Sequence, residues 1–215
     1  MSEPTIFIID DDPSARRGLT RLVRAAGLNA ESFSSGADYL ASEHRTGPGC
    51  IVLDVRMPEM TGPELQEELA KADYSMPIVF LSAHADVPIA AGAMKKGAVD
   101  FLTKPVDGKD LLAAIEESLT RDAENRKQGA ETSSIHELIA KLTPREHEVM
   151  TYVITGMLNK QIAGRLEISE ETVKIHRSRV MQKLGVVSVA ELVRLCEKVG
   201  IPPARPESTH PPSSQ

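Results

Sequence analysis

Short apolar runs alternate with amphipathic segments through the first 120 residues of the chain. Four runs have the length and apolar content of strands that are buried on both faces of a sheet, and a weaker alternation marks an outer strand at 29–33. The four runs lie at 6–9, 51–53, 78–81 and 99–103. Helical spacing predicts one helix that begins at Pro13 and further helices over 35–43, 63–72, 88–96 and 109–119. This alternation predicts an α/β fold in which helices cover both faces of a parallel sheet.

A different pattern follows residue 140, where only helical spacing is found. Thr143, Pro144 and Glu146 form a capping box with a proline start, which is a specific signal for the first turn of a helix. Further helices are expected at 159–167, 169–184 and 189–199. The pattern therefore predicts a second domain that is all α-helical.

The segment between the two patterns is charged and lacks apolar periodicity. Residues 120–134 are either a solvated extension of the preceding helix or a flexible linker with a break near 129–134. Residues 201–215 contain five prolines and are expected to be disordered. The predicted organisation is a domain at 1–120, an interdomain linker at 121–137, a helical domain at 138–200 and a disordered tail at 201–215.

Charge divides the chain in the same way. The net charge is -6, but residues 1–128 carry 14 basic and 21 acidic residues, whereas residues 129–215 carry 11 and 10. Segment 174–183 contains four basic residues and no acid. Two distant cysteines suggest a reducing compartment, and no apolar stretch has the length of a membrane helix. We expect a cytoplasmic protein with no membrane partner, whose two halves do different work.

Polar residues stand where the predicted buried strands end. The C-terminal ends of parallel strands lie along one edge of a sheet, so these groups can converge there. They are Asp10, Asp11, Asp54, Ser82 and Lys104. Three close carboxylates repel one another unless a cation intervenes, and an all-oxygen ligand set favours Mg²⁺ or Mn²⁺. The lysine and the hydroxyl suit a phosphoryl group, so the set predicts phosphoryl transfer onto a carboxylate oxygen.

Four motifs that carry these groups resemble the receiver domain of two-component response regulators over about residues 4–120. The motifs are Ile-Ile-Asp-Asp-Asp, Leu-Asp-Val-Arg-Met-Pro, Leu-Ser-Ala and Thr-Lys-Pro. The resemblance implies a flavodoxin-like strand order 2-1-3-4-5 and a cis Lys104-Pro105 bond. It also assigns roles to the site residues. These are Asp54 as phosphoacceptor; Asp11, Asp54 and the Arg56 carbonyl as metal ligands, with Asp10 acting through water; Ser82 and Lys104 as phosphoryl ligands; and Phe101 at the aromatic switch position, which is often Tyr. The role of Asp12, beyond capping the first helix, stays open.

The third helix of the second domain, 169–184, has two distinct faces. The residues on its inner face are apolar. Those on its outer face are basic or small, which suits insertion into the DNA major groove by a helix-turn-helix. Lys174 and Arg179 are expected to reach base edges, while Arg177 and Lys183 are expected to contact phosphates. The alternative is a charged face that only faces solvent.

Motifs across 138–199 resemble the LuxR-type (NarL/FixJ) DNA-binding domain, among them Thr-Val-Lys-Ile-His-Arg-Ser. The resemblance implies base recognition mainly by Lys174, Ile175 and Ser178, and pairing through the last helix. Together the two resemblances imply a transcription factor that a sensor histidine kinase phosphorylates. They imply a homodimer when phosphorylated, with double-stranded promoter DNA and RNA polymerase as partners. The order of the domains further resembles regulators of styrene and toluene breakdown.

Two other functions could use an aspartate at a strand end or a helix-turn-helix. A phosphatase or dehalogenase with an aspartate nucleophile normally requires Asp-x-Asp, and residue 56 is Arg, so the chain is not expected to be an enzyme. A DNA-binding regulator whose receiver is only a phosphorylation-independent scaffold remains the alternative. DNA affinity that does not respond to phosphorylation would favour it.

Overall fold

A computed structural model describes residues 3–42, 47–72, 75–84 and 86–204. It divides between Lys127 and Gln128 into two compact units, which we describe separately. The first unit is an α/β domain, and the second is helical, as the sequence patterns predict.

The first unit is built on a five-stranded parallel sheet in the order β2-β1-β3-β4-β5, which confirms the predicted strand order. The strands are β1 (Thr5–Ile9), β2 (Asn29–Phe33), β3 (Gly49–Asp54), β4 (Ile78–Ser82) and β5 (Asp100–Thr103). All residues of β3 and β4 are buried, as expected for central strands of a sheet covered on both faces. The sheet therefore presents the ends of β1, β3 and β4 side by side at one edge.

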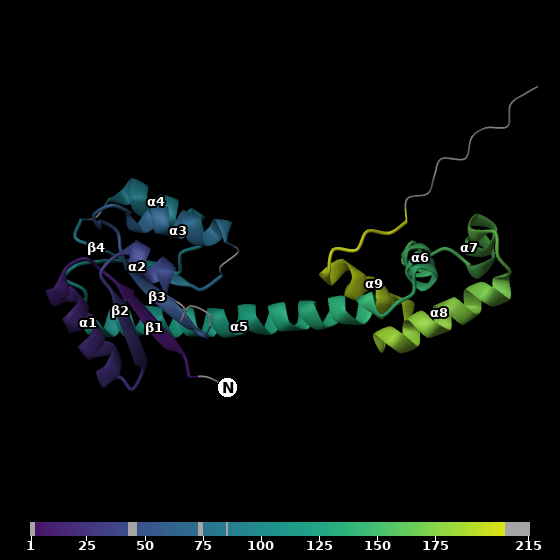
Figure 1. The fold of residues 1–215 in the computed structure, drawn as a ribbon, viewed down its shortest axis with the longest axis horizontal. Helices are drawn as coiled ribbons and strands as arrows, with labels where there is room; N and C mark the ends of the chain where they lie inside the picture. The colour runs from purple at the N-terminus through teal and green to yellow at the C-terminus, as the bar shows by residue number, and fades with distance from the viewer. Residues whose placement is uncertain (1–2, 43–46, 73–74, 85, 205–215) are drawn as a thin grey trace, which may run out of the picture. The chain divides into compact units, whose positions relative to one another are not determined.

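Helices cover the two faces of this sheet in separate layers (Figure 1). They are α1 (Pro13–Ala25), α2 (Gly36–Ala41), α3 (Gly62–Lys71), α4 (Val87–Lys95) and α5 (Gly108–Ala140). Helices α1 and α5 pack on one face around Val23 and Leu111, while α2, α3 and α4 pack on the other around Tyr39 and Leu65. The layers follow from the apolar stripes, since each helix buries one stripe against the strands.

Helix α5 is longer than the sequence indicates. It runs without interruption for 33 residues, through the stretch 129–134 where a flexible linker would break. Of the two readings that the sequence left open for residues 120–134, the structure has the helical extension. Propensity explains the continuity, because this stretch is rich in Ala, Glu, Lys, Arg and Gln and contains only one glycine, Gly129, and no proline.

The second unit consists of the last turns of α5 and four further helices. These are α6 (Pro144–Val153), α7 (Asn159–Leu166), α8 (Glu170–Leu184) and α9 (Val189–Lys198). The predicted capping box at Thr143 is present, and Ser169 caps α8 through the amide of Thr172. Gly185 ends α8 at φ 67°, a left-handed conformation that glycine adopts without strain. Val149, Ile162 and Leu192 are fully buried in the common core.

The first residues of the predicted disordered tail, 201–204, contact the second unit. Ile201 packs against the core of the second unit, and the amide of Ala204 donates to the Thr151 carbonyl at 3.0 Å. The rest of the predicted tail, 205–215, lies outside the described residues. Both cysteines, Cys50 and Cys196, are buried, and burial raises the pKa of the Cys50 thiol to about 12. In the described part of the chain, no helix combines the length and the apolar character needed to cross a membrane.

Candidate functional site

Three charged side chains from separate strand ends meet at the edge of the sheet. Asp10 follows β1, Asp54 ends β3, and Lys104 follows β5. The Lys104 ammonium donates to Asp10 Oδ2 at 2.7 Å and also to Asp54 Oδ1. Both carboxylates are buried, whereas the lysine side chain keeps a quarter of its surface exposed. The structure thus brings together three groups that the sequence placed at this edge.

Burial and charge act in opposite directions on this cluster. Burial raises the pKa of the Asp54 carboxyl above its usual range, and the bond from Lys104 only partly offsets this effect. Burial disfavours the Lys104 ammonium, but its bonds to Asp10 and Asp54 raise the pKa of this lysine overall. The Asp54 carboxylate is therefore poorly solvated, and the Lys104 ammonium is the cation that stabilises its charge. Such an environment suits a nucleophile.

The other expected metal ligands are Asp11 and the Arg56 carbonyl. Asp54 Oδ2 accepts a 2.7 Å hydrogen bond from the Arg56 amide. Asp11 is exposed, and among the described residues no three His, Cys, Asp or Glu side chains are grouped as metal ligands. Asp10 and Asp54 fit a hard cation by their donor oxygens. Asp12 caps α1 by accepting from the Ser14 amide at 2.8 Å, which gives this acid the capping role.

Ser82 lies on β4, next to the strand of Asp54, and Phe101 lies on β5, one strand further. In the sheet register Asp54 pairs with Leu81, so Ser82 is one residue further along β4. The Ser82 hydroxyl donates to the His84 carbonyl at 2.8 Å and is thus bound within its own loop. Phe101 packs inward on Phe80, with ring centroids 6.1 Å apart. The Lys104-Pro105 bond is cis, as the resemblance implied.

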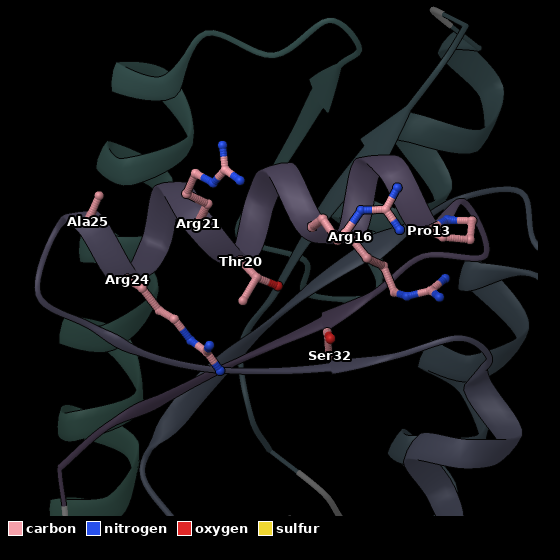
Figure 2. A pocket seen from close by; sticks show the side chains of 8 residues that line it. Pro13, Arg16, Thr20, Arg21, Arg24, Ala25 and Ser32 are labelled. Carbon is pink, nitrogen blue, oxygen red and sulfur yellow. The ribbon is translucent and has the colours of Figure 1, made fainter.

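A row of arginines that the sequence reading did not single out lines α1. Arg16, Arg17, Arg21 and Arg24 border a groove of about 820 Å³ between α1 and β2 (Figure 2). Arg16 donates to the carbonyls of Asp10 and Asp11, so the groove begins beside the acidic edge. Among the described residues, Arg17 and Arg21 have no hydrogen-bonding or ion-pair partner. Their spacing of four residues in an otherwise acidic half could have indicated this surface.

Helix α8 has the two faces that the sequence predicts. Val173, Val180 and Leu184 are buried in the core. Its outer residues are exposed, and they include Lys174, Ile175, Ser178, Arg179 and Gln182. Ile175 keeps 45% of its surface exposed, although exposure of an apolar side chain to water is unfavourable. An exposed apolar residue between cations is suited to contact with a thymine methyl group.

The two flanking cations of α8 are bound inside the domain. Arg177 donates to the side chain of Asn159 on α7 at 3.1 Å. Lys183 donates to Glu146 at 2.6 Å and to the Lys141 carbonyl at 3.1 Å. The Lys183 ammonium, together with the Thr143 amide, lowers the pKa of the Glu146 carboxyl to about 2. These contacts fasten α8 to α6 and α7, so both residues hold the helix-turn-helix together.

Comparison with known proteins agrees with this division. Residues 6–116 match the family described as the response regulator receiver domain, and residues 140–196 match the luxR family of bacterial regulatory proteins. Receiver domains generally bind Mg²⁺ for their phosphorylation. A receiver domain implies a histidine kinase as a partner, and a LuxR-type domain implies binding to DNA.

Relatives match along nearly the whole chain. The response regulator protein TodT of Pseudomonas putida is 43% identical over 90% of this chain and 86% of its own length. Nodulation protein W of Bradyrhizobium diazoefficiens is 41% identical over 95% and 90%. The solved structure of the response regulator StyR has 47% identity and a TM-score of 0.78, and covers 92% of this chain and 100% of its own. Full-length FixJ from B. japonicum has 39% identity, a TM-score of 0.56, and coverage of 94% and 99%. The chain belongs to the response regulators that join a receiver domain to a LuxR-type helix-turn-helix domain, and it is a regulator of transcription.

Proposed function

We propose that Asp54 accepts a phosphoryl group from a sensor histidine kinase and that this modification controls the binding of promoter DNA. The observation that supports the proposal is the cluster at the sheet edge, where Lys104 links Asp10 to a buried Asp54. A buried acid with one mobile cation is more than a strand end requires, since a capping or turn residue needs no such partner.

The proposed transfer breaks a phosphorus–nitrogen bond on the donor histidine and forms a phosphorus–oxygen bond on Asp54, which leaves the imidazole neutral after protonation by water. The Lys104 ammonium moves from Asp54 to a phosphoryl oxygen and so neutralises charge where it develops. Asp11, Asp54 and the Arg56 carbonyl are the proposed ligands of Mg²⁺ or Mn²⁺, with Asp10 acting through water, and the ion when bound would offset phosphoryl charge.

The switch proposed to follow involves Ser82 and Phe101. The Ser82 hydroxyl exchanges the His84 carbonyl for a phosphoryl oxygen, because a charged acceptor forms the stronger bond. Movement of Ser82 changes the space at the ends of β4 and β5, where Phe101 packs on Phe80. The surface near α4, β5 and α5 then favours a homodimer.

The dimer is the proposed form that binds the promoter. Two α8 helices then engage paired half-sites, and dimerisation raises affinity because the second contact becomes intramolecular. RNA polymerase is the proposed further partner at the promoter.

The test is incubation of the full chain with acetyl phosphate and a divalent cation, followed by intact-mass measurement and by promoter binding. Asp54→Asn is expected to abolish phosphoryl uptake, whereas the matched change Asp12→Asn leaves it intact because asparagine still caps α1. Equal uptake by Asp54→Asn would show that the site is assigned wrongly. A promoter affinity that is unchanged by phosphorylation would favour the scaffold alternative.

A further inference from the structure

Helix α5 keeps buried polar groups beyond the end of the receiver match at residue 116. Ser118 and Asp122 are 0% and 2% exposed. Asp122 also lies outside the luxR match, which begins at residue 140. A buried carboxylate is costly unless it is paired and hydrogen-bonded, so Asp122 calls for an explanation.

Asp122 is bound to the beginning of β3. Its Oδ2 accepts from the Gly49 amide at 3.0 Å and from Arg126 Nε at 2.7 Å. Arg126 in turn donates to the Gly47 carbonyl. One carboxylate and one guanidinium, on successive turns of α5, thus bind the backbone at the first residue of β3 and two residues before it.

The strand entrance is tightly specified. A Cβ at Gly49 would come within 2.0 Å of the Thr5 carbonyl oxygen, so only glycine fits where β3 begins beside β1. Residues 50–53 are buried and paired with β1 on one side and, at 51–53, with β4 on the other. The strand that Asp122 holds at Gly49 therefore continues as a rigid element to Asp54, the proposed phosphoacceptor.

The other half of α5 belongs to the second unit. Ile139 is 9% exposed in the core of that unit, and Glu131 forms an ion pair with Lys198 of α9. The helix is continuous from Gly108 to Ala140. A single helix therefore carries both the contacts with β3 and the contacts with the DNA-binding domain.

We propose that Asp122 and Arg126 form a clamp, positioning α5 on the start of β3, and that this clamp transmits the state of Asp54 to the DNA-binding domain. The inference rests on the proposed function. Asp122 and Arg126 are positioning residues, since neither contacts Asp54 or the groups around it at the sheet edge. Their role differs from that of a surface ion pair, because the Asp122 side chain is 3% exposed and binds strand backbone.

The test uses the full chain with Asp122→Asn and, separately, Arg126→Gln. Glu124→Gln is the control, because this acid lies on the same helix and is exposed. Acetyl phosphate labels Asp54, and intact mass follows uptake. Promoter affinity is measured before and after labelling, and amide exchange reports protection at Gly49.

Both clamp variants are expected to label at the wild-type rate and to lose protection at Gly49. The increase in promoter affinity on phosphorylation should shrink by about fivefold or more, the lower range of typical coupling between sites. An unchanged increase in both variants would overturn the proposal. If the Asp122→Asn variant does not fold, the Arg126→Gln variant tests the proposal by itself, because the Arg126 side chain is 40% exposed. Failure of the wild-type chain itself to label, or to respond on DNA, would instead refute the proposed function.

Discussion

The two halves of the molecule use charge in opposite ways. At the sheet edge of the receiver unit, the functional charges are buried and bound to one another, as Lys104 is to Asp10 and Asp54. On the outer face of α8, Arg179 and Ser178 are exposed, and Lys174 has only a surface pair with Glu171 at 3.3 Å. The charged groups of the sheet edge are buried, whereas those on the outer face of α8 are exposed to solvent.

This difference indicates what each site needs. A phosphoryl acceptor must work in a poorly solvated place, where a single ammonium has a large effect on the neighbouring carboxylates. A DNA-binding helix needs cations that attract phosphates over a distance and release counterions, so exposure is an advantage. Mutations and salt should therefore affect the two halves very differently, and four expected outcomes follow in order of size.

The largest effect is expected for Lys104→Met. Loss of the ammonium removes charge stabilisation at the phosphoryl group, so uptake from acetyl phosphate should fall by about 100-fold. Because Lys104 lowers the pKa of Asp54, its loss should raise that pKa and move the pH profile of uptake to higher pH. Lys96→Met is the control, since Lys96 pairs with Glu67 on the surface. An unmoved pH profile would contradict the coupling between Lys104 and Asp54.

A second comparison separates the arginine groove from the acidic cluster. Arg17 and Arg21 would attract an acidic surface on the proposed kinase partner, so Arg17→Glu with Arg21→Glu should slow phosphorylation by that kinase by about tenfold or more. Uptake from acetyl phosphate should not change, since neither arginine contacts Asp54. Lys71→Glu with Lys95→Glu, on α3 and α4, makes the same charge change elsewhere. Equal slowing with both phosphoryl donors would mean that the arginines act on the chemistry and not on docking.

The exposed face of α8 gives a third outcome. Lys174→Ala should weaken promoter binding by about fivefold, equivalent to about 1 kcal/mol, the lower end of the range for a base contact. Contact of Lys174 with phosphate alone would instead weaken binding to all sequences and lower the salt slope by about one. Arg194→Ala, on α9, is the matched loss of one exposed cation. Binding titrations at several salt concentrations distinguish the cases, and no change in either quantity would remove Lys174 from the interface.

The smallest effect concerns the stability of the second unit at acid pH. The folded-state pKa of Glu146 is about 2, below the usual 4.5, so its ion pair stabilises this unit above pH 4.5. The contribution is lost as pH falls through that window towards 2. Glu146→Gln keeps the capping amide but not the charge, so its unfolding temperature should vary less with pH over this window. Thermal unfolding of both chains across this pH window provides the measurement, and parallel curves of unfolding temperature against pH would argue against the assignment.

Much of the fold could be predicted from the sequence because its signals are local. The runs before Asp10, Asp54 and Ser82 are fully buried strands, and these runs placed three groups at one edge correctly. The capping residues Thr143 and Ser169 marked helix starts in the same local way. Strand order, in contrast, came from family resemblance, because periodicity alone does not say which strands are neighbours.

The remaining features depend on partners far apart in the chain. Asp122 looked like one more charge in a polar stretch, and only its bond to Gly49, 73 residues earlier, shows that it is buried. Lys183 is predicted to contact DNA phosphate, and no local signal indicates that it also donates to Glu146, 37 residues earlier in the chain. Arg16 was hidden in the same way, since backbone carbonyls do not differ from residue to residue in a sequence. Long-range polar contacts of this kind leave no periodic signal.

The two buried cysteines have a practical consequence. Cys50 and Cys196 are inaccessible, and the pKa of Cys50 is raised to about 12, so at neutral pH a maleimide reagent should react with neither in the native chain. A cysteine introduced on α1 and another on α9 would then be the reactive thiols. Paired dyes or spin labels at those positions could follow the separation of the two units through a phosphorylation cycle without first removing the natural cysteines.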